Sequence, residues 1–141
     1  MAWVSPFPPD RGGIADYSAN IVQALKGRAR VDLWTDEPLA PPLSTAFRVV
    51  DYRREPTRTD ELENYDAVIY NVGNHPEHHG SIVDLLARHP GVVVLHDMAL
   101  NNLFLGHLGR ARYVRRMLPR YGAGGAVWFS RNAARYFAAR T

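Results

Sequence analysis

The sequence predicts an α/β protein with a Rossmann-like, doubly wound parallel sheet that carries helices on both faces. Two observations lead to this fold class. Short apolar runs of the kind found in buried strands alternate along the 141 residues with segments whose apolar residues recur at helical spacing. Glycines and prolines separate these segments. Alternation of this kind favours a parallel sheet with both faces covered.

Five apolar runs predict the strands in order along the chain. The first run is stopped by Pro6, the fourth is apolar enough to be buried on both faces, and the fifth ends at His96. We expect the first strand to lie at the centre of the sheet. The predicted strands span residues 2–5, 31–35, 47–52, 67–70 and 92–95.

Apolar residues spaced three and four apart predict the helices. Gly12 and Gly13 open the first helix, and Asp97 is placed to cap the helix that follows it. Pro119 must end or kink its segment, because proline cannot continue the helical hydrogen bonding. Residues 55–64 are polar and predict a loop or a short helix. The predicted helices span residues 13–26, 77–89, 98–105, 110–118 and 125–139.

The composition excludes several kinds of site and location. There is no cysteine, so disulfides, thiolate metal sites and cysteine nucleophiles are excluded. No apolar run approaches the roughly 18 residues of a membrane-spanning helix. The first residues do not form a signal peptide. We therefore expect a cytoplasmic protein.

Charge is distributed unevenly along the chain. Residues 1–109 hold nine Lys and Arg and fourteen Asp and Glu, whereas residues 110–141 hold eight Arg and no acid. Such a basic end could meet phosphates, anionic lipid or an acidic partner; a solvated or otherwise covered helix face is the alternative. It carries no nucleic-acid-binding signature, so we expect no nucleic acid partner.

Ligands of parallel α/β folds bind beyond the carboxyl ends of the strands. That rule selects residues 6–13, residues 71–75 and the turn after the fifth strand. In the first segment, Gly12 and Gly13 at a helix N-terminus could admit a phosphate, or could serve only a tight turn. The segment matches neither a P-loop nor a dinucleotide fingerprint.

The other two segments carry polar side chains. His96 could hydrogen-bond a sugar hydroxyl or move a proton; alternatively, a backbone carbonyl satisfies it and Asp97 only caps a helix. Asn74 is the better candidate for a sugar or backbone contact in its segment, because the histidines that follow it do not match a metal-binding spacing. We expect no metal site.

Three stretches resemble the group 1 retaining glycosyltransferases. They are VSPFPPDRGGIADYS at residues 4–18, YDAVIYNVGN at residues 65–74 and GVVVLHDMAL at residues 91–100, in the family's order. The resemblance implies a GT-B architecture, in which two Rossmann-like domains face a cleft. The N-terminal domain mainly holds the acceptor and the other domain mainly holds a nucleotide-sugar donor. Sugar is transferred with retention, and no metal or other cofactor is needed.

The resemblance also implies roles for individual residues. Gly13 matches the glycine loop near the donor phosphates, and His96 matches the histidine near the transferred sugar. Asp16 and Asn74 flank the same cleft. We predict His96 as the catalytic residue, and we predict substrate or phosphate contacts for Gly12, Gly13, Asp16, Asn74 and Asp97.

Two features of the family are missing from this chain. They are a pair of glutamates eight positions apart and the basic pair that neutralises the leaving diphosphate. The resemblance therefore implies that residues 1–141 are one acceptor-side domain, truncated and inactive alone, with the donor-binding domain absent. The expected partners are a nucleotide-sugar, a sugar or lipid-linked acceptor, the missing C-terminal domain and, peripherally, a membrane.

One alternative remains open at this point. The chain could be a non-catalytic Rossmann-like binding or interaction domain. Its ligand would then be a nicotinamide nucleotide, with Asp36 after the second strand on the ribose, or a protein partner.

Overall fold

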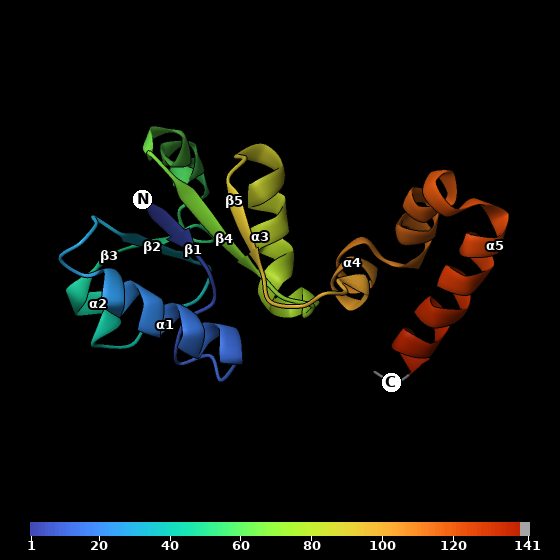
Figure 1. The fold of residues 1–141 in the computed structure, drawn as a ribbon, viewed down its shortest axis with the longest axis horizontal. Helices are drawn as coiled ribbons and strands as arrows, with labels where there is room; N and C mark the ends of the chain where they lie inside the picture. Colours follow the sequence, from blue (N-terminus) through green and yellow to red (C-terminus); the bar gives the residue numbers. More distant parts are fainter. Residues whose placement is uncertain (139–141) are drawn as a thin grey trace. The chain divides into compact units, whose positions relative to one another are not determined.

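A computed structural model describes residues 1–138 of the chain (Figure 1). It forms two compact units, which are described separately below. The first comprises Met1–Gly73 and Ser81–Met98, and the second comprises Asn74–Gly80 and the chain from Ala99 onward. The elements are β1 (Ala2–Val4), α1 (Gly13–Leu25), β2 (Asp32–Thr35), α2 (Leu43–Ala46), β3 (Arg48–Asp51), the 3-10 helix η1 (Pro56–Asn64), β4 (Val68–Val72), α3 (Pro76–Arg88), β5 (Val92–Leu95), α4 (Asn101–Leu108) and α5 (Arg110–Ala138).

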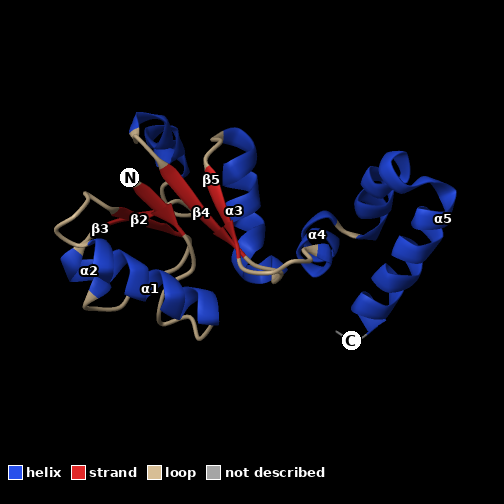
Figure 2. Cartoon of the chain, in the orientation of Figure 1, coloured by secondary structure: helices blue, strands red, loops and turns tan. Residues whose placement is uncertain are grey.

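The first unit is built on one parallel sheet. Within the described residues, five strands pair in the order β3-β2-β1-β4-β5, and every pairing is parallel (Figure 2). The predicted α/β, Rossmann-like fold class is confirmed. All five predicted strands are present, and β1 lies at the centre as expected. The polar segment at residues 55–64 forms η1.

Helices cover both faces of the sheet (Figure 1). On one face, Val22 of α1 and Leu43 of α2 pack in a buried cluster with Trp3 and Leu33 of the strands. On the other face, the Tyr70 hydroxyl donates to the backbone carbonyl of His89, the residue after α3. Tyr65, the residue after η1, contacts the Trp34 ring edge-on. Strand residues therefore alternate between two apolar layers, as two-sided coverage requires.

The two edges of the sheet differ in chemistry. β3 begins with Arg48 and ends with Asp51, both engaged in ion pairs. β5 has no charged residue, and its Val92 and Leu95 side chains are 57% and 60% exposed. Gly91, just before β5, has no room for a side chain, because a Cβ would lie 2.5 Å from the Val68 carbonyl oxygen.

The second unit contains α4, α5 and a short polar segment from Asn74 to Gly80. Its buried centre joins Leu105 of α4 to Tyr113 of α5, and the Tyr113 hydroxyl donates to Asn101 Oδ1 at 3.2 Å. Within α5 the backbone leaves helical geometry at Gly122 (φ 64°, ψ −171°). The sequence placed this break at Pro119, which instead lies within the helix.

The start of α4 corrects one expectation. The predicted helix at residues 98–105 is observed at Asn101–Leu108, so Asp97 does not cap it. The cap comes from Asn74, whose Oδ1 accepts hydrogen bonds from the backbone N–H groups of Asn102 (2.9 Å) and Leu103 (3.1 Å). An acceptor at this position satisfies N–H groups that have no partner inside the helix.

Among the described residues, no helix combines the length and the apolar character needed to cross a membrane. Residues 139–141, which include the end of the last predicted helix and Arg140, lie outside the described part of the chain.

Candidate functional site

Three elements of the first unit bring polar and aromatic groups together at the carboxyl edge of the sheet. His96 follows β5, and its backbone N–H donates to the Val72 carbonyl at the end of β4 (3.0 Å). The His96 ring nitrogen Nε2 lies 3.0 Å from Oδ1 of Asn71, the penultimate residue of β4. Asn71 is fully buried, whereas His96 is partly exposed. The imidazole is thus bonded to a buried side chain and is itself partly exposed to solvent.

Helix α1 borders the same group. The ring of Tyr17, in the second turn of α1, meets the His96 ring edge-on with centroids 4.8 Å apart. Ser18, the next residue of α1, has a buried hydroxyl that is hydrogen-bonded to the Ser5 hydroxyl at 2.7 Å. This bond links the residue after β1 to α1. The end of β1 and the His96 ring are therefore each joined to α1 by a direct contact.

The N-cap residue of α1 is a glycine, and the Asp10 carboxylate lies beside it. Gly12 is the N-cap residue and makes no side-chain hydrogen bond to the helix. Gly13 is exposed, and a Cβ built on it would meet no atom within 4 Å. A helix N-terminus presents backbone N–H groups and the positive end of the helix dipole, which together favour an anion.

Burial sets the electrostatics of His96. Partial desolvation lowers the pKa of His96 below its ordinary value, and the nearby Asp97 carboxylate opposes this only in part. The imidazole is therefore mainly neutral at neutral pH, and one of its ring nitrogens is available as an acceptor.

Comparisons of the chain with protein-family models, with curated proteins and with solved structures found no match. The functional argument therefore depends on the residues themselves.

The structure places the six predicted site residues in different surroundings. Gly12, Gly13 and His96 belong to the first unit, where Tyr17 connects the start of α1 with the His96 ring. Two further predicted residues, Asp16 on α1 and Asp97 after β5, are exposed. Asn74 belongs to the second unit, where its carboxamide caps α4.

Two residues of this surface were not predicted from the sequence. Asn71 is the single polar residue in the apolar run of β4, and a buried amide inside a strand is a usable signal. Tyr17 shares the helical spacing of the apolar residues of α1, and yet it is 38% exposed. Helical periodicity alone does not distinguish it from a core residue.

The histidines after β4 do not form a metal centre. His75 and His78 have ring centroids 4.9 Å apart, and His79 is buried. Among the described residues, no group of three or more His, Asp or Glu side chains is arranged to hold a metal ion.

Asp36, the residue considered for a nicotinamide ribose, is hydrogen-bonded to two other side chains of the first unit. Asp36 Oδ2 accepts hydrogen bonds from the Ser81 hydroxyl (2.9 Å) and from Arg53 (3.1 Å), and the Asp36 side chain is 8% exposed. The burial of this side chain and the two bonds to Oδ2 leave the carboxylate little access to a ribose. This arrangement weighs against the nicotinamide alternative.

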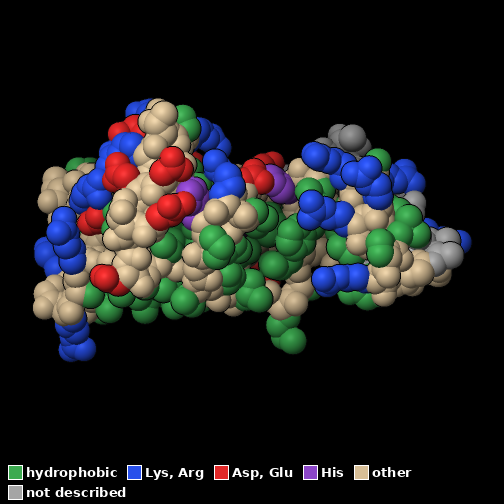
Figure 3. Space-filling view, turned by 90° about the horizontal axis from the view of Figure 1, so that it is seen from above, with side chains coloured by type: hydrophobic (Ala, Val, Ile, Leu, Met, Phe, Trp, Pro, Cys, Tyr) green, Lys and Arg blue, Asp and Glu red, His purple; other side chains and the backbone are tan. Residues whose placement is uncertain are grey.

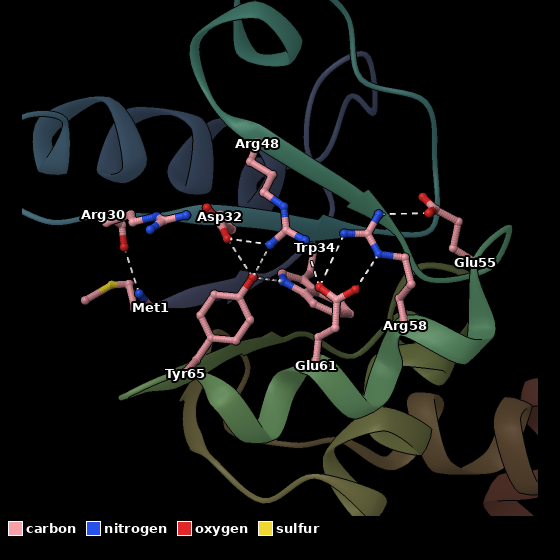
Figure 4. A network of polar contacts seen from close by, with 9 residues as sticks. All are labelled: Met1, Arg30, Asp32, Trp34, Arg48, Glu55, Arg58, Glu61 and Tyr65. Carbon is pink, nitrogen blue, oxygen red and sulfur yellow. Dashed lines mark hydrogen bonds and ion pairs between the residues drawn. The ribbon is translucent and has the colours of Figure 1, made fainter.

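The opposite, amino edge of the sheet carries an ion-pair network (Figure 4). Arg48 at the start of β3 bonds to Asp32 on β2 (2.9 Å), to the Tyr65 hydroxyl (2.9 Å) and to Glu61 on η1 (2.7 Å). Arg58 also binds Glu61, at 2.7 Å. Four of these residues border a hollow of about 450 Å³, namely Asp32, Arg48, Glu61 and Tyr65. Because the network's charges are paired with one another, we assign it the structural role of holding β2, β3 and η1 together.

We expect Arg48→Met to lower the free energy of unfolding by about 1–2 kcal/mol at pH 7, because the buried Asp32 carboxylate loses its charged partner. Burial raises the pKa of Asp32, but hydrogen bonds from Tyr65 and Arg48 outweigh it and leave that pKa below its ordinary value. Hydrogen bonds from Arg58 and Arg48 lower the pKa of Glu61 to about 2.

The pH dependence of this effect has a definite sign. Carboxylates with depressed folded-state pKa values stabilise the fold above their unfolded pKa of about 4, and this contribution disappears as the pH falls. The difference between wild type and Arg48→Met should therefore shrink between about pH 5 and pH 2, as measured by urea unfolding. Arg54→Met is the control, because Arg54 is 73% exposed and its ion pair is on the surface. An equal loss in both variants would contradict the assignment.

Proposed function

We propose that this chain is the acceptor-side domain of a glycosyltransferase that moves a sugar from a nucleotide-sugar to an acceptor with retention. The observation that carries the proposal is the juxtaposition of His96, Asn71 and Tyr17 with the start of α1 at the carboxyl edge. This is the edge at which parallel α/β folds bind ligands.

The chemistry of the surface suits a nucleotide-sugar. Backbone N–H groups at Gly13 and the dipole of α1 favour a phosphate. The neutral imidazole of His96 can bond a hydroxyl, and the exposed face of Tyr17 offers an apolar surface beside it. The resemblance to group 1 enzymes implies the same two roles for Gly13 and His96.

On this proposal, chemistry needs groups that this chain does not supply. Transfer from a nucleotide-sugar builds negative charge on the leaving diphosphate, and fixed positive groups stabilise it. The resemblance assigns those groups to a donor-binding domain. The present chain would bind and orient substrates rather than turn them over alone.

The binding surface can be tested by a change of charge at Gly13. We expect Gly13→Asp to keep or slightly raise stability, because an acidic residue at a helix N-terminus is favourable. The same carboxylate should repel the diphosphate and weaken binding of UDP- and GDP-sugars at least about tenfold. Gly13→Asn, an isosteric neutral variant, is the matched control. Binding is measured by NMR titration of the amide resonances of α1 and the ring of His96.

Two results would refute the proposal. One is the absence of any shift at Gly13, Tyr17 and His96 with every nucleotide-sugar offered. The other is a rise in melting temperature with NAD and with none of the nucleotide-sugars, which would favour the nicotinamide alternative.

We also propose that the basic end of the chain contacts an anionic surface. The arginines of α5 with described side chains, at positions 110, 112, 115, 116, 120 and 131, are all exposed. Leu118 and Tyr121 are exposed on the same helix, at 41% and 58%. Arginine side chains gather over the α4–α5 unit in Figure 3, where they are blue. Arginine combined with exposed apolar groups is typical of a helix that lies on a membrane surface.

Vesicle co-sedimentation tests this contact. We expect binding to vesicles with anionic lipid to exceed binding to neutral vesicles, and to weaken when salt rises from about 0.1 M to 1 M, because salt screens exposed charges. Arg115→Gln with Arg116→Gln should reduce the bound fraction, whereas Arg53→Gln on the first unit should not. A bound fraction that depends neither on the anionic lipid content nor on the salt concentration would contradict the proposal.

A further inference from the structure

The amide of Asn71 is held in a fixed orientation inside the sheet. Its side chain is completely buried. Its Nδ2 donates to the backbone carbonyl of Val4 on the central strand, at 3.5 Å. A carbonyl oxygen can only accept, so the Asn71 group that faces Val4 must be the NH₂ group. The oxygen Oδ1 is therefore the atom that faces His96.

This orientation decides where the proton of His96 resides. Asn71 Oδ1 is an acceptor, and it lies 3.0 Å from His96 Nε2. A hydrogen bond at that distance requires Nε2 to carry the proton. In the neutral imidazole the other nitrogen, Nδ1, then has a free lone pair.

The ring is also restrained in orientation. The His96 backbone N–H is bonded to Val72, and the Tyr17 ring lies edge-on against the imidazole. Within the described part of the chain, Asn71 is the hydrogen-bond partner of the imidazole. The titratable groups near the ring are Tyr17 and Asp97, from α1 and from the turn after β5.

We propose that Asn71 is a positioning residue that holds the proton of His96 on Nε2, so that Nδ1 accepts a hydrogen bond from a hydroxyl of the bound sugar. The choice of a sugar hydroxyl rests on the proposed function, whereas the tautomer does not. A reversed amide would donate to Nε2 and favour the opposite tautomer, whereas a non-polar residue at position 71 would favour neither. The lowered pKa of His96 agrees with a ring that works in its neutral form.

The first experiment reads the tautomer directly. In the full chain labelled with ¹⁵N, the two ring nitrogens of His96 are observed by NMR above the pKa of the imidazole. We expect Nε2 to be protonated, its proton to exchange slowly with water, and Nδ1 to be unprotonated. A proton found on Nδ1 in the wild type would overturn the proposal without any variant.

The second experiment changes the acceptor. Asn71→Asp places a carboxylate beside Nε2 and should raise the pKa of His96 by about one unit or more. Asn71→Leu removes the acceptor and should abolish the slow exchange of the Nε2 proton. Asn20→Asp, on the exposed side of α1, adds the same charge elsewhere and should leave the His96 pKa within a few tenths of a unit. An unchanged pKa in a folded Asn71→Asp protein, or slow exchange that survives in a folded Asn71→Leu protein, would overturn the role of Asn71.

Addition of UDP-glucose or GDP-mannose separates this inference from the proposed function. A hydrogen bond accepted by Nδ1 should shift the Nδ1 resonance of the wild type and shift it less in Asn71→Leu. The predicted tautomer without any response to nucleotide-sugars would support the positioning role and refute the glycosyltransferase ligand. A response of Nδ1 to a nucleotide-sugar, together with an Nε2 that carries no proton, would support the glycosyltransferase ligand and refute the positioning role.

Discussion

Replacing Trp34 with alanine is expected to lower the free energy of unfolding by about 3–5 kcal/mol, the usual cost of deleting a fully buried tryptophan. Trp34 has no exposed surface and lies on β2 between Val4 of β1 and Val50 of β3, which are also fully buried. Its indole meets the Tyr65 ring at 6.1 Å. Alanine would leave a cavity under η1 that neighbouring strands, fixed by their hydrogen bonds, cannot close.

Urea unfolding followed by far-ultraviolet circular dichroism measures this loss, since the signal does not depend on tryptophan fluorescence. Trp34→Phe retains most of the ring volume and should lose much less stability than Trp34→Ala. Trp128→Ala is the control for an exposed tryptophan, because Trp128 is 55% exposed. Equal losses for Trp34→Ala and Trp128→Ala would show that the interior of the first unit is not organised around β2.

Replacing Gly91 with alanine is expected to cost about 3 kcal/mol, at the upper end for overpacking of a close-packed site. The added Cβ would lie 2.5 Å from the Val68 carbonyl oxygen and 2.8 Å from the Tyr70 ring. The Tyr70 ring is fully buried and its hydroxyl is bonded to the His89 carbonyl, and the Val68 carbonyl belongs to β4 and cannot move without disturbing the pairing of β4 with β5. The strain would therefore fall on the strand that leads to His96.

Gly13→Ala is the matched control for that substitution. A Cβ at Gly13 meets no atom within 4 Å, and alanine favours the helix that begins there, so its stability should be unchanged or slightly raised. Both variants are compared by thermal and urea unfolding. If Gly91→Ala unfolds at the same urea concentration as the wild type, the close packing of Gly91 against β4 is wrong.

The sheet was predictable because its signals are local and strong. The runs AWV and VVVL are short, apolar and bounded by turn residues, and parallel strands covered on both faces need only apolar residues. The central position of the first strand followed from the fold class rather than from any feature of Ala2–Val4. Exact ends were less certain, as at β3, predicted at residues 47–52 and observed at Arg48–Asp51.

The polar details were not predictable, because they depend on partners distant in sequence. The sequence offered Asp97 as the cap of the following helix, since it stood directly before the helical pattern. The acceptor that caps α4 is Asn74, more than twenty positions earlier. Likewise, the helix break was assigned to Pro119, but Gly122 can adopt a positive φ and takes the bend instead.

The candidate site was predictable only in part for the same reason. His96 and Gly13 could be selected because each stands at the carboxyl end of a predicted strand or at the start of a helix. Asn71 lies within an apolar strand, and no rule of spacing links it to His96. Only the pairing of β4 with β5 brings the two side chains together.

The central position of β1 has a consequence for synthesis. Ala2 pairs with Asp32 on one side and with Val68 on the other, so β1 is synthesised before both of its neighbours. The side of β1 that pairs with β4 stays unpaired until residues 68–72 have been made. Parallel pairing over such separations is slow, because the loops must close before the contacts form. During this interval the unpaired side of β1 is open to incorrect pairing, which is the kind of exposure against which chaperones protect nascent chains.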